Sequence, residues 1–221
     1  MTTMLEKDCV CALCGAMNQC FVLSSSNNFG GMDTEFRSYA VGIDPLSVYV
    51  ETCSTCGYAA YDLSKEMPGH ILPEVRKAVD QFYVSEGLNK TEVPTHKKYE
   101  LTALLMQIRS SPSENVAETF LRAAWMADDA TEEPFAAKYR NSAAKLLEQA
   151  LAADTGEKNN SETLFRLAEI YRRSGNYQLA LATFDKIDNS KLHPDLQKAS
   201  AKLRQIAKNQ DNSAIKFQEL L

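Results

Sequence analysis

The pattern of apolar and polar positions changes once along the chain, near residues 66 to 72. Before this point, three short stretches rich in aromatic or β-branched residues predict strands at 19–23, 36–41 and 47–52. Loops rich in Gly, Ser, Asn or Pro separate them. After this point the apolar residues recur with helical spacing. The sequence therefore predicts an α+β chain, with a small antiparallel domain at 1–68 and an all-α domain at 69–221.

Several segments of the second part predict helices. The segment 72–83 has Pro at its start and an apolar face, and 97–108 repeats this apolar spacing. The run Ser111-Pro-Ser-Glu114 forms a capping box that opens a helix toward residue 128. Pro194 opens another helix, whose basic residues lie opposite its apolar face, as expected for the last helix of a stack.

The clearest internal pattern covers residues 161–188. With Ser161 as the first position of a tetratricopeptide unit of about 34 residues, Ala168 and Ala180 fall where two helices approach closely. Gly175 falls at the turn between them. A weaker copy begins near Phe120. We therefore predict a tetratricopeptide-like solenoid, and an ordinary helical hairpin is the alternative.

This register also predicts a binding groove, because fixed positions of the first helix of each unit face the concave side. These positions are Glu162, Phe165, Glu169, Arg172 and Arg173, with Leu121, Trp125 and Asp128 in the weaker copy. We expect an aromatic and aliphatic floor with charged rims that binds a protein or peptide. In the alternative interpretation, Trp125 packs against a neighbouring helix and the two arginines are solvated.

Two cysteine hooks with the pattern C-x-x-C-G enclose the strands of the first domain. Cys11 and Cys14 form one hook, and Cys53 and Cys56 form the other. Each hook brings two sulfurs together, and the following Gly lets the backbone turn past a metal. Four thiolates complete a tetrahedron, so we predict one structural zinc ion with no open position for catalysis. The first domain is then a zinc ribbon.

The remaining cysteines, Cys9 and Cys20, do not fit the hooks. The start of the chain has no signal-like apolar run, so we expect a cytoplasmic protein in which reduced thiols and metal prevail over disulfides. We interpret these two residues as a spare thiol and a small buried side chain. The alternative is that Cys9 exchanges with the metal ligands under oxidation.

Charge and composition limit the classes of partner that the protein is expected to bind. Residues 1–70 hold three basic against eight acidic residues, a formal charge of −5, and zinc thiolates add negative charge. This N-terminal part, called the head below, repels phosphates, which argues against binding of nucleic acid. Since the chain also lacks an apolar run of about 18 residues, we expect no membrane span. The partner class left is protein or peptide, and the oligomeric state stays open.

Motifs for catalysis are weak. The three His residues are scattered, and the sequence contains no nucleophile elbow, zincin motif or phosphate loop. One acidic group, Asp33 and Glu35 with Arg37 nearby, has the chemistry to orient a cation or act as an acid. The alternative is a turn residue and a paired charge. We therefore predict a protein that is not an enzyme.

The hooks, the segments 33–36, 53–60 and 122–125 and the repeat together resemble a bacterial family, domain of unknown function 2225, over nearly the whole chain. Glu35 and Ser54 depart from its usual Asp and Pro, and the cysteines are intact. The resemblance implies a metal-binding ribbon before a tetratricopeptide-like half. Two functions stay open: a protein-protein interaction module, or a sensor in which thiol oxidation releases zinc.

Overall fold

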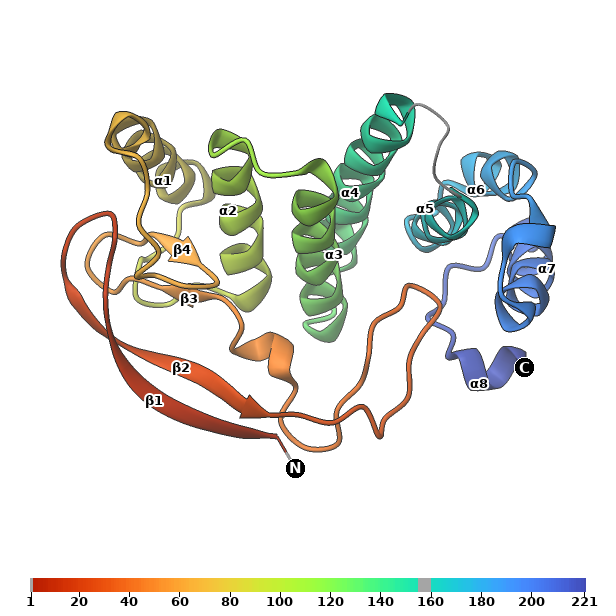
Figure 1. Cartoon of the computed structure of the whole chain (residues 1–221), viewed down its shortest axis with the longest axis horizontal. Coiled ribbons are helices and arrows are strands. Elements are labelled where there is room, and N and C mark those ends of the chain that lie inside the picture. Colours follow the sequence, from red (N-terminus) through yellow and green to blue (C-terminus); the bar gives the residue numbers. More distant parts are fainter. Residues whose placement is uncertain (1, 155–159) are drawn as a thin grey trace.

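The computed structural model, which describes residues 2–154 and 160–221, begins with a long antiparallel hairpin (Figure 1). β1 (Thr3–Val10) pairs along its length with β2 (Met17–Ser25). A second small sheet joins β3 (Glu51–Thr52) to β4 (Ala59–Ala60). One cysteine hook lies between the two strands of each sheet, so each sheet holds the two ends of its hook together.

The remainder of the described chain is mostly helical, which confirms an α+β chain with a small antiparallel sheet at its N-terminal end. Its longer helices are α1 (Leu72–Glu86), α2 (Thr95–Ile108), α3 (Ser113–Asp129), α4 (Glu133–Ala153), α5 (Ser161–Arg173), α6 (Tyr177–Phe184) and α7 (Pro194–Lys208). Short helical turns are η1 (Pro45–Ser47), η2 (Gly69–Ile71), η3 (Asn189–Lys191) and α8 (Phe217–Leu220). The helices expected at 72–83, 97–108, 113–128 and after Pro194 are all present.

Two of the three expected strands are corrected by the structure. The stretch 36–41 forms no strand, because Phe36 has a left-handed backbone with φ of 67° and its ring turns toward the helices. The stretch 47–52 is a strand only at its last two residues. β1 was not expected, because most of its side chains are exposed on both faces and leave no alternating pattern.

The head and the helices share buried side chains. Tyr58, Leu63, Val75 and Tyr99 belong to one contiguous core that includes residues of both parts. The hydroxyl of Tyr99 donates to the carbonyl of Leu46 at 2.7 Å. The two parts therefore share one core, while the domain boundary at residue 68 stays a prediction.

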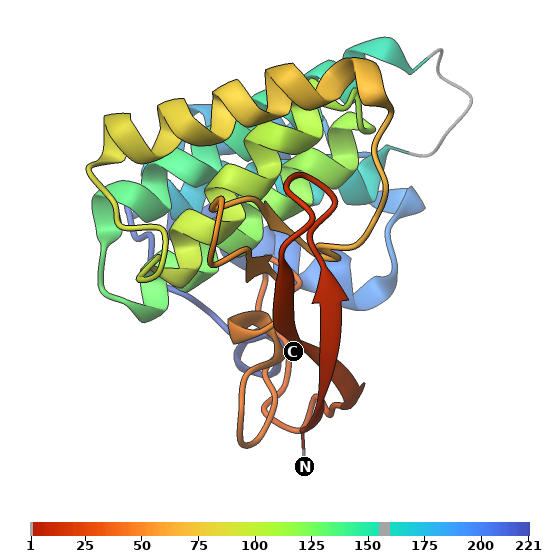
Figure 2. The ribbon, with the colours of Figure 1, turned by 90° about the vertical axis from the view of Figure 1, so that its left-hand side faces the viewer.

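Consecutive helices from α2 onward pack side by side as an array (Figures 1 and 2). The turn between α5 and α6 contains Gly175 with a φ of 79°, the left-handed conformation that favours glycine. The solenoid itself stays a prediction. Among the helices of the described residues, none combines the length and the apolar character that crossing a membrane requires.

Candidate metal centre and helical groove

Both cysteine hooks have the same backbone geometry. The amide of Gly15 donates to the carbonyl of Cys11 at 2.8 Å, and the amide of Gly57 donates to that of Cys53 at 2.8 Å. Both glycines have left-handed backbones, with φ of 76° and 80°. A side chain is disfavoured in this conformation, which is the physical reason for Gly after each hook.

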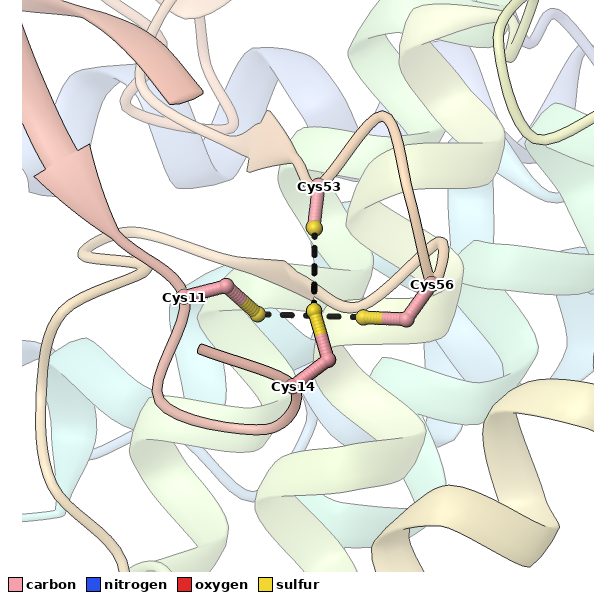
Figure 3. A group of neighbouring side chains, drawn as sticks. All are labelled: Cys11, Cys14, Cys53 and Cys56. Atoms are coloured by element: carbon pink, nitrogen blue, oxygen red, sulfur yellow. Dashed lines mark hydrogen bonds between the residues drawn. The ribbon is translucent and has the colours of Figure 1, made fainter. Parts of the chain in front are cut away.

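The four hook sulfurs converge on one point (Figure 3). All four lie within 4.8 Å of one another, and the Cys11–Cys56 and Cys14–Cys53 pairs are each 3.7 Å apart. A tetrahedral ion with sulfur ligands at about 2.3 Å has edges of about 3.8 Å. The four cysteines therefore fit one metal ion, as the hook spacing predicts.

The surroundings of the sulfurs favour thiolate at one position. Burial alone would raise the pKa of Cys53, but hydrogen bonds from the backbone of Cys56 and Thr55 and from the side chain of Asn18 lower it to about 7. The amide Nδ2 of Asn18 lies 3.5 Å from Cys53 Sγ. Asn18 belongs to β2 and thereby links the hairpin to the second hook.

The helical half supports the centre directly. Tyr83 of α1 donates its hydroxyl to the carbonyl of Gly57 at 3.0 Å, and Arg76 donates to the carbonyl of Leu13 at 2.8 Å. The Tyr83 ring packs so closely that a Cβ on Gly57 would lie 2.4 Å from it. Each hook is thus fixed against α1, and the Cys53 and Cys11 side chains are buried.

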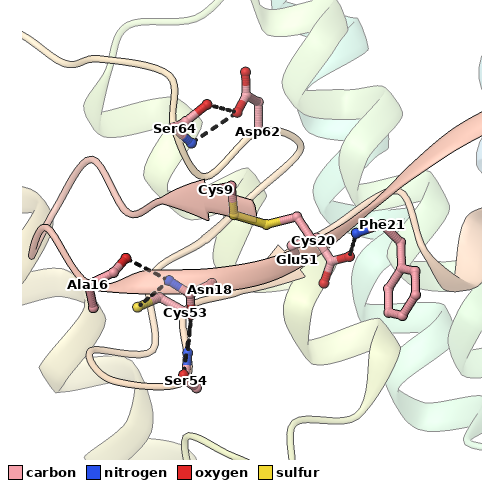
Figure 4. Close-up of a disulfide and its surroundings, with 10 residues drawn as sticks. All are labelled: Cys9, Ala16, Asn18, Cys20, Phe21, Glu51, Cys53, Ser54, Asp62 and Ser64. Carbon is pink, nitrogen blue, oxygen red and sulfur yellow. Dashed lines mark hydrogen bonds between the residues drawn. A yellow bond between two sulfur atoms is a disulfide. The ribbon is translucent and has the colours of Figure 1, made fainter. Parts of the chain in front are cut away.

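Cys9 and Cys20 form a disulfide in the hairpin (Figure 4). Their interpretation as a spare thiol and a small apolar residue is therefore corrected. Cys9 pairs with Asn18 and Cys20 with Lys7, so the two cysteines are diagonal neighbours on one face, with Cα atoms 6.1 Å apart. This is a usual separation for a disulfide. The available sequence signal was the position of one cysteine on each side of the first hook.

The predicted groove residues meet at one place but are mostly covered by the chain itself. Leu121, Phe165, Glu169 and Arg172 have exposed fractions of 0 %, and Trp125 is 4 % exposed. A loop of the head, residues 34–37, lies against them beneath α3 and α5 (Figure 1). Arg172 is therefore not solvated, in contrast to the alternative interpretation. Binding of a partner by the predicted groove residues stays a prediction.

Glu35 is the centre of this contact. Its carboxylate accepts from Arg140 Nε at 2.8 Å and Nη2 at 2.6 Å, and from Trp125 Nε1 at 3.1 Å. Arg173 Nε lies 3.5 Å away. Burial alone would raise the pKa of Glu35, but the charge and hydrogen bonds of Arg140, with further help from Arg173 and Trp125, lower it to about 2. Glu35 therefore acts as a buried anion that anchors the loop.

The residues beside Glu35 strengthen the same contact. Thr34 donates to Glu169 at 2.5 Å, and Arg37 donates to Asp129 at 2.9 and 2.6 Å and to Asp44 at 2.7 Å. Asp33 closes the turn by accepting from the amides of Glu35 and Arg37 at 2.9 Å each. This geometry matches the alternative interpretation of the two acids, in which Asp33 is a turn residue and Glu35 is a paired charge.

Burial raises the pKa of Asp33 to about 6, with the nearby charge of Glu35 as a second cause. Arg37 contacts Asp33 through its backbone amide, while its guanidinium points to α3.

The C-terminal segment covers the other side of the loop. Arg172 donates to the carbonyls of Asp211 at 2.6 Å and Ser213 at 2.8 Å. The rings of Phe36, Phe165 and Phe217 form a cluster, with centroids 5.8 Å apart for Phe36 and Phe165, 5.6 Å for Phe36 and Phe217 and 6.3 Å for Phe165 and Phe217. Residues far apart in the sequence therefore meet around one loop.

Sequence reasoning missed Arg140, the principal partner of Glu35, and Asp129, a principal partner of Arg37. Arg140 lies on α4 and Asp129 at the end of α3, and their contacts join positions more than 90 residues apart, 105 for Glu35 and Arg140 and 92 for Arg37 and Asp129. Arg140 is 2 % exposed, and an arginine amid apolar helical positions was the available signal.

Part of the predicted groove stays open. A cavity of about 470 Å³ lies beside the loop and is lined by Asp128, Arg140, Arg173 and Ser213, among others. Asp128 has a side-chain exposure of 27 % and accepts from both arginines. Asp128 and Arg173 are thus the predicted groove residues that line this cavity, while Glu162 lies exposed on α5.

Comparisons with known proteins agree with the sequence resemblance. A family model described as "Uncharacterized protein conserved in bacteria (DUF2225)" matches residues 4–213, which includes both hooks, the buried loop and the helical array. Searches among curated proteins and among solved structures give no match. The chain therefore belongs to the bacterial family of domain of unknown function 2225.

Proposed function

We propose that this protein is a zinc-containing protein-protein interaction module, an adaptor of the bacterial cytoplasm and not an enzyme. The observation that carries the proposal is the loop at 34–37, a turn of the chain held by charged and aromatic side chains of three helices. The helical array already binds a segment of its own chain. A partner segment of similar chemistry uses the same residues.

Zinc is the metal of this proposal. Four thiolates with tetrahedral spacing suit zinc, and a closed set of four protein ligands leaves no position for water or substrate. The bound ion contributes folding free energy by joining the two hooks, which belong to separate sheets. The hooks in turn fix the start and end of the segment that carries the buried loop.

The helical half, in this proposal, is a tetratricopeptide-like solenoid whose concave residues recognise the partner. The cavity beside Asp128 and Arg173 is where a partner chain makes its first contact. Displacement of the C-terminal segment then exposes Phe165 and Arg172, since Phe217 and the carbonyls of Asp211 and Ser213 cover them.

Two substitutions with opposite expected effects test the groove. Phe217→Ala weakens the covering segment and leaves the helices unchanged, so recovery of a crosslinked partner from the native cell increases. Arg173→Glu reverses a charge at the open cavity, so recovery of the same partner decreases. Leu179→Ala, an exposed position of α6, is the control. Equal recovery with all three proteins contradicts a groove that binds partners.

A second function, a thiol and zinc redox sensor, has one observation in its favour. The Cys9–Cys20 disulfide lies in the hairpin whose Asn18 contacts Cys53, and Cys14 and Cys56 are partly exposed to oxidants. Mild peroxide distinguishes the two functions. Fast zinc release that thiols reverse supports the sensor, and slow release supports the interaction module alone.

A further inference from the structure

β1 is a strand with one unpaired edge. Among residues 2–154 and 160–221, its sheet contains β2 as the single neighbour, and β1 lies farther from the helices than β2 (Figure 1). Six of its eight residues are exposed. The outer edge of β2, in contrast, is partly used, because the amide of Phe21 donates to the Glu51 carboxylate at 2.9 Å.

The strand register shows which groups the free edge offers. Phe21 pairs with Glu6, and the Phe21 amide points away from β1 toward Glu51. Residues of such a pair in an antiparallel sheet both turn their backbone groups outward. With a period of two, Met4, Glu6, Asp8 and Val10 all present N–H and C=O groups to solvent at the outer edge.

The side chains at this edge carry unneutralised negative charge. Glu6 and Asp8 lie on one face of β1, and within the part of the chain that the structure describes neither carboxylate has an ion-pair partner. Val10 and Met17, which pair across the hairpin on the same face, are 47 % and 65 % exposed. An incoming strand therefore meets two acids followed by an apolar pair.

A second copy of this chain is a poor occupant of the edge. Antiparallel pairing of two β1 strands about a two-fold axis centred on Glu6 places Glu6 opposite Glu6. Centring on Lys7 places Glu6 opposite Asp8, and centring on Asp8 places Asp8 opposite Asp8. Like charges directly opposite one another destabilise a sheet, so each central register is disfavoured.

We propose that the outer edge of β1 binds an extended segment of another protein as a third strand. Lys or Arg at two alternate positions of the segment faces Glu6 and Asp8, and an apolar residue two positions further packs on Val10 and Met17. Backbone hydrogen bonds supply the affinity, and the alternate side chains supply the specificity. This surface is separate from the helical groove, so the two proposals stand or fall independently.

The test uses the full-length, metal-loaded protein and a synthetic peptide, acetyl-Val-Thr-Lys-Thr-Lys-Thr-Val-amide. We expect the peptide to bind in fluorescence anisotropy and to slow the hydrogen exchange of the Glu6 and Asp8 amides, which point outward. The amides of Leu5 and Lys7 already face β2 and should change little. The double variant Glu6→Lys, Asp8→Lys should bind at least about tenfold more weakly.

Two controls separate strand addition from general charge attraction. The double variant Glu66→Lys, Glu74→Lys makes the same change of charge at exposed sites outside the hairpin and should bind as the unmodified protein does. A peptide N-methylated at alternate residues keeps its charge but loses backbone donors, and should not bind. Absent binding of the first peptide at millimolar concentration, equal binding of the methylated peptide, or equal weakening by both double variants overturns the proposal.

Discussion

The buried anion Glu35 offers the sharpest test of how the head is joined to the helices. We expect Glu35→Gln, which keeps the size of the side chain and removes its charge, to destabilise the protein by about 3 kcal/mol at neutral pH. Folding lowers the pKa of Glu35 from 4.5 to about 2. By linkage this corresponds to about 3 kcal/mol. Loss of one member of a buried ion pair costs roughly 3–5 kcal/mol. We expect the lower end of this range because Arg140 keeps its ion pair with Asp128.

The pH dependence of this difference follows from its sign. A carboxyl whose pKa is lower in the folded state contributes stability above its unfolded pKa, and the contribution is lost as the pH falls through the folded pKa. The difference between the unmodified protein and Glu35→Gln is therefore complete at pH 7 and declines between about pH 4.5 and 2. Acid also protonates other groups of both proteins, so only the difference between them is interpreted.

Urea unfolding measures the effect directly. Trp125 is the single tryptophan, and its indole donates to Glu35, so its fluorescence reports on this contact. Glu162→Gln, at an exposed acid of α5, is the matched control and should change stability by less than about 0.5 kcal/mol. A loss below about 1 kcal/mol for Glu35→Gln at pH 7, or a loss that persists unchanged in acid, would refute the reasoning.

Four further predictions concern the centre and the groove. Purified protein should contain about one equivalent of zinc, and Cys14→Ser should lose it and disorder the head, as metal analysis and NMR can show; less than half an equivalent in the unmodified protein would be contrary evidence. Trp125→Ala should destabilise by about 3–5 kcal/mol in urea unfolding, since this buried ring fills the contact with the loop. Gly57→Ala should lower the melting temperature, because its φ is 80° and Tyr83 occupies the space of a Cβ; an unchanged value would count against this packing. Without reductant, alkylation should leave Cys9 and Cys20 unmodified, and labelling of both would show that the disulfide is absent.

Short-range features of this chain could be predicted from the sequence, and long-range ones could not. The hooks depend on residues three positions apart and on one left-handed glycine, so their spacing carries the full signal. The helices depend on apolar periodicity over three or four turns. The two hooks are about 40 residues apart in the sequence. Their assignment to one metal centre was possible because both have the same C-x-x-C-G pattern.

The structure of the loop around Glu35 could not be predicted from the sequence pattern. Phe36 and Tyr39 have the composition of a strand, but the carboxylate of Asp33 and the helical arginines make a turn more favourable than a ladder. The arginines lie on α4 and α5, at separations that no local pattern encodes. The same limit applies to β1, whose solvent-exposed faces give no alternation.

The contact of the loop with the end of the chain has a consequence for synthesis on the ribosome. The backbone amide of Thr34 donates to the carbonyl of Ile215 at 3.0 Å, 181 residues later, and Asp33 forms a β-bridge with Lys216. At about 5–20 residues per second, the ribosome needs roughly 10–40 s to make the intervening chain. The hairpin closes in microseconds. Until residues 211–217 have left the ribosome, the side of the loop that carries Phe36 lacks their cover, so the loop is fully buried only late in synthesis.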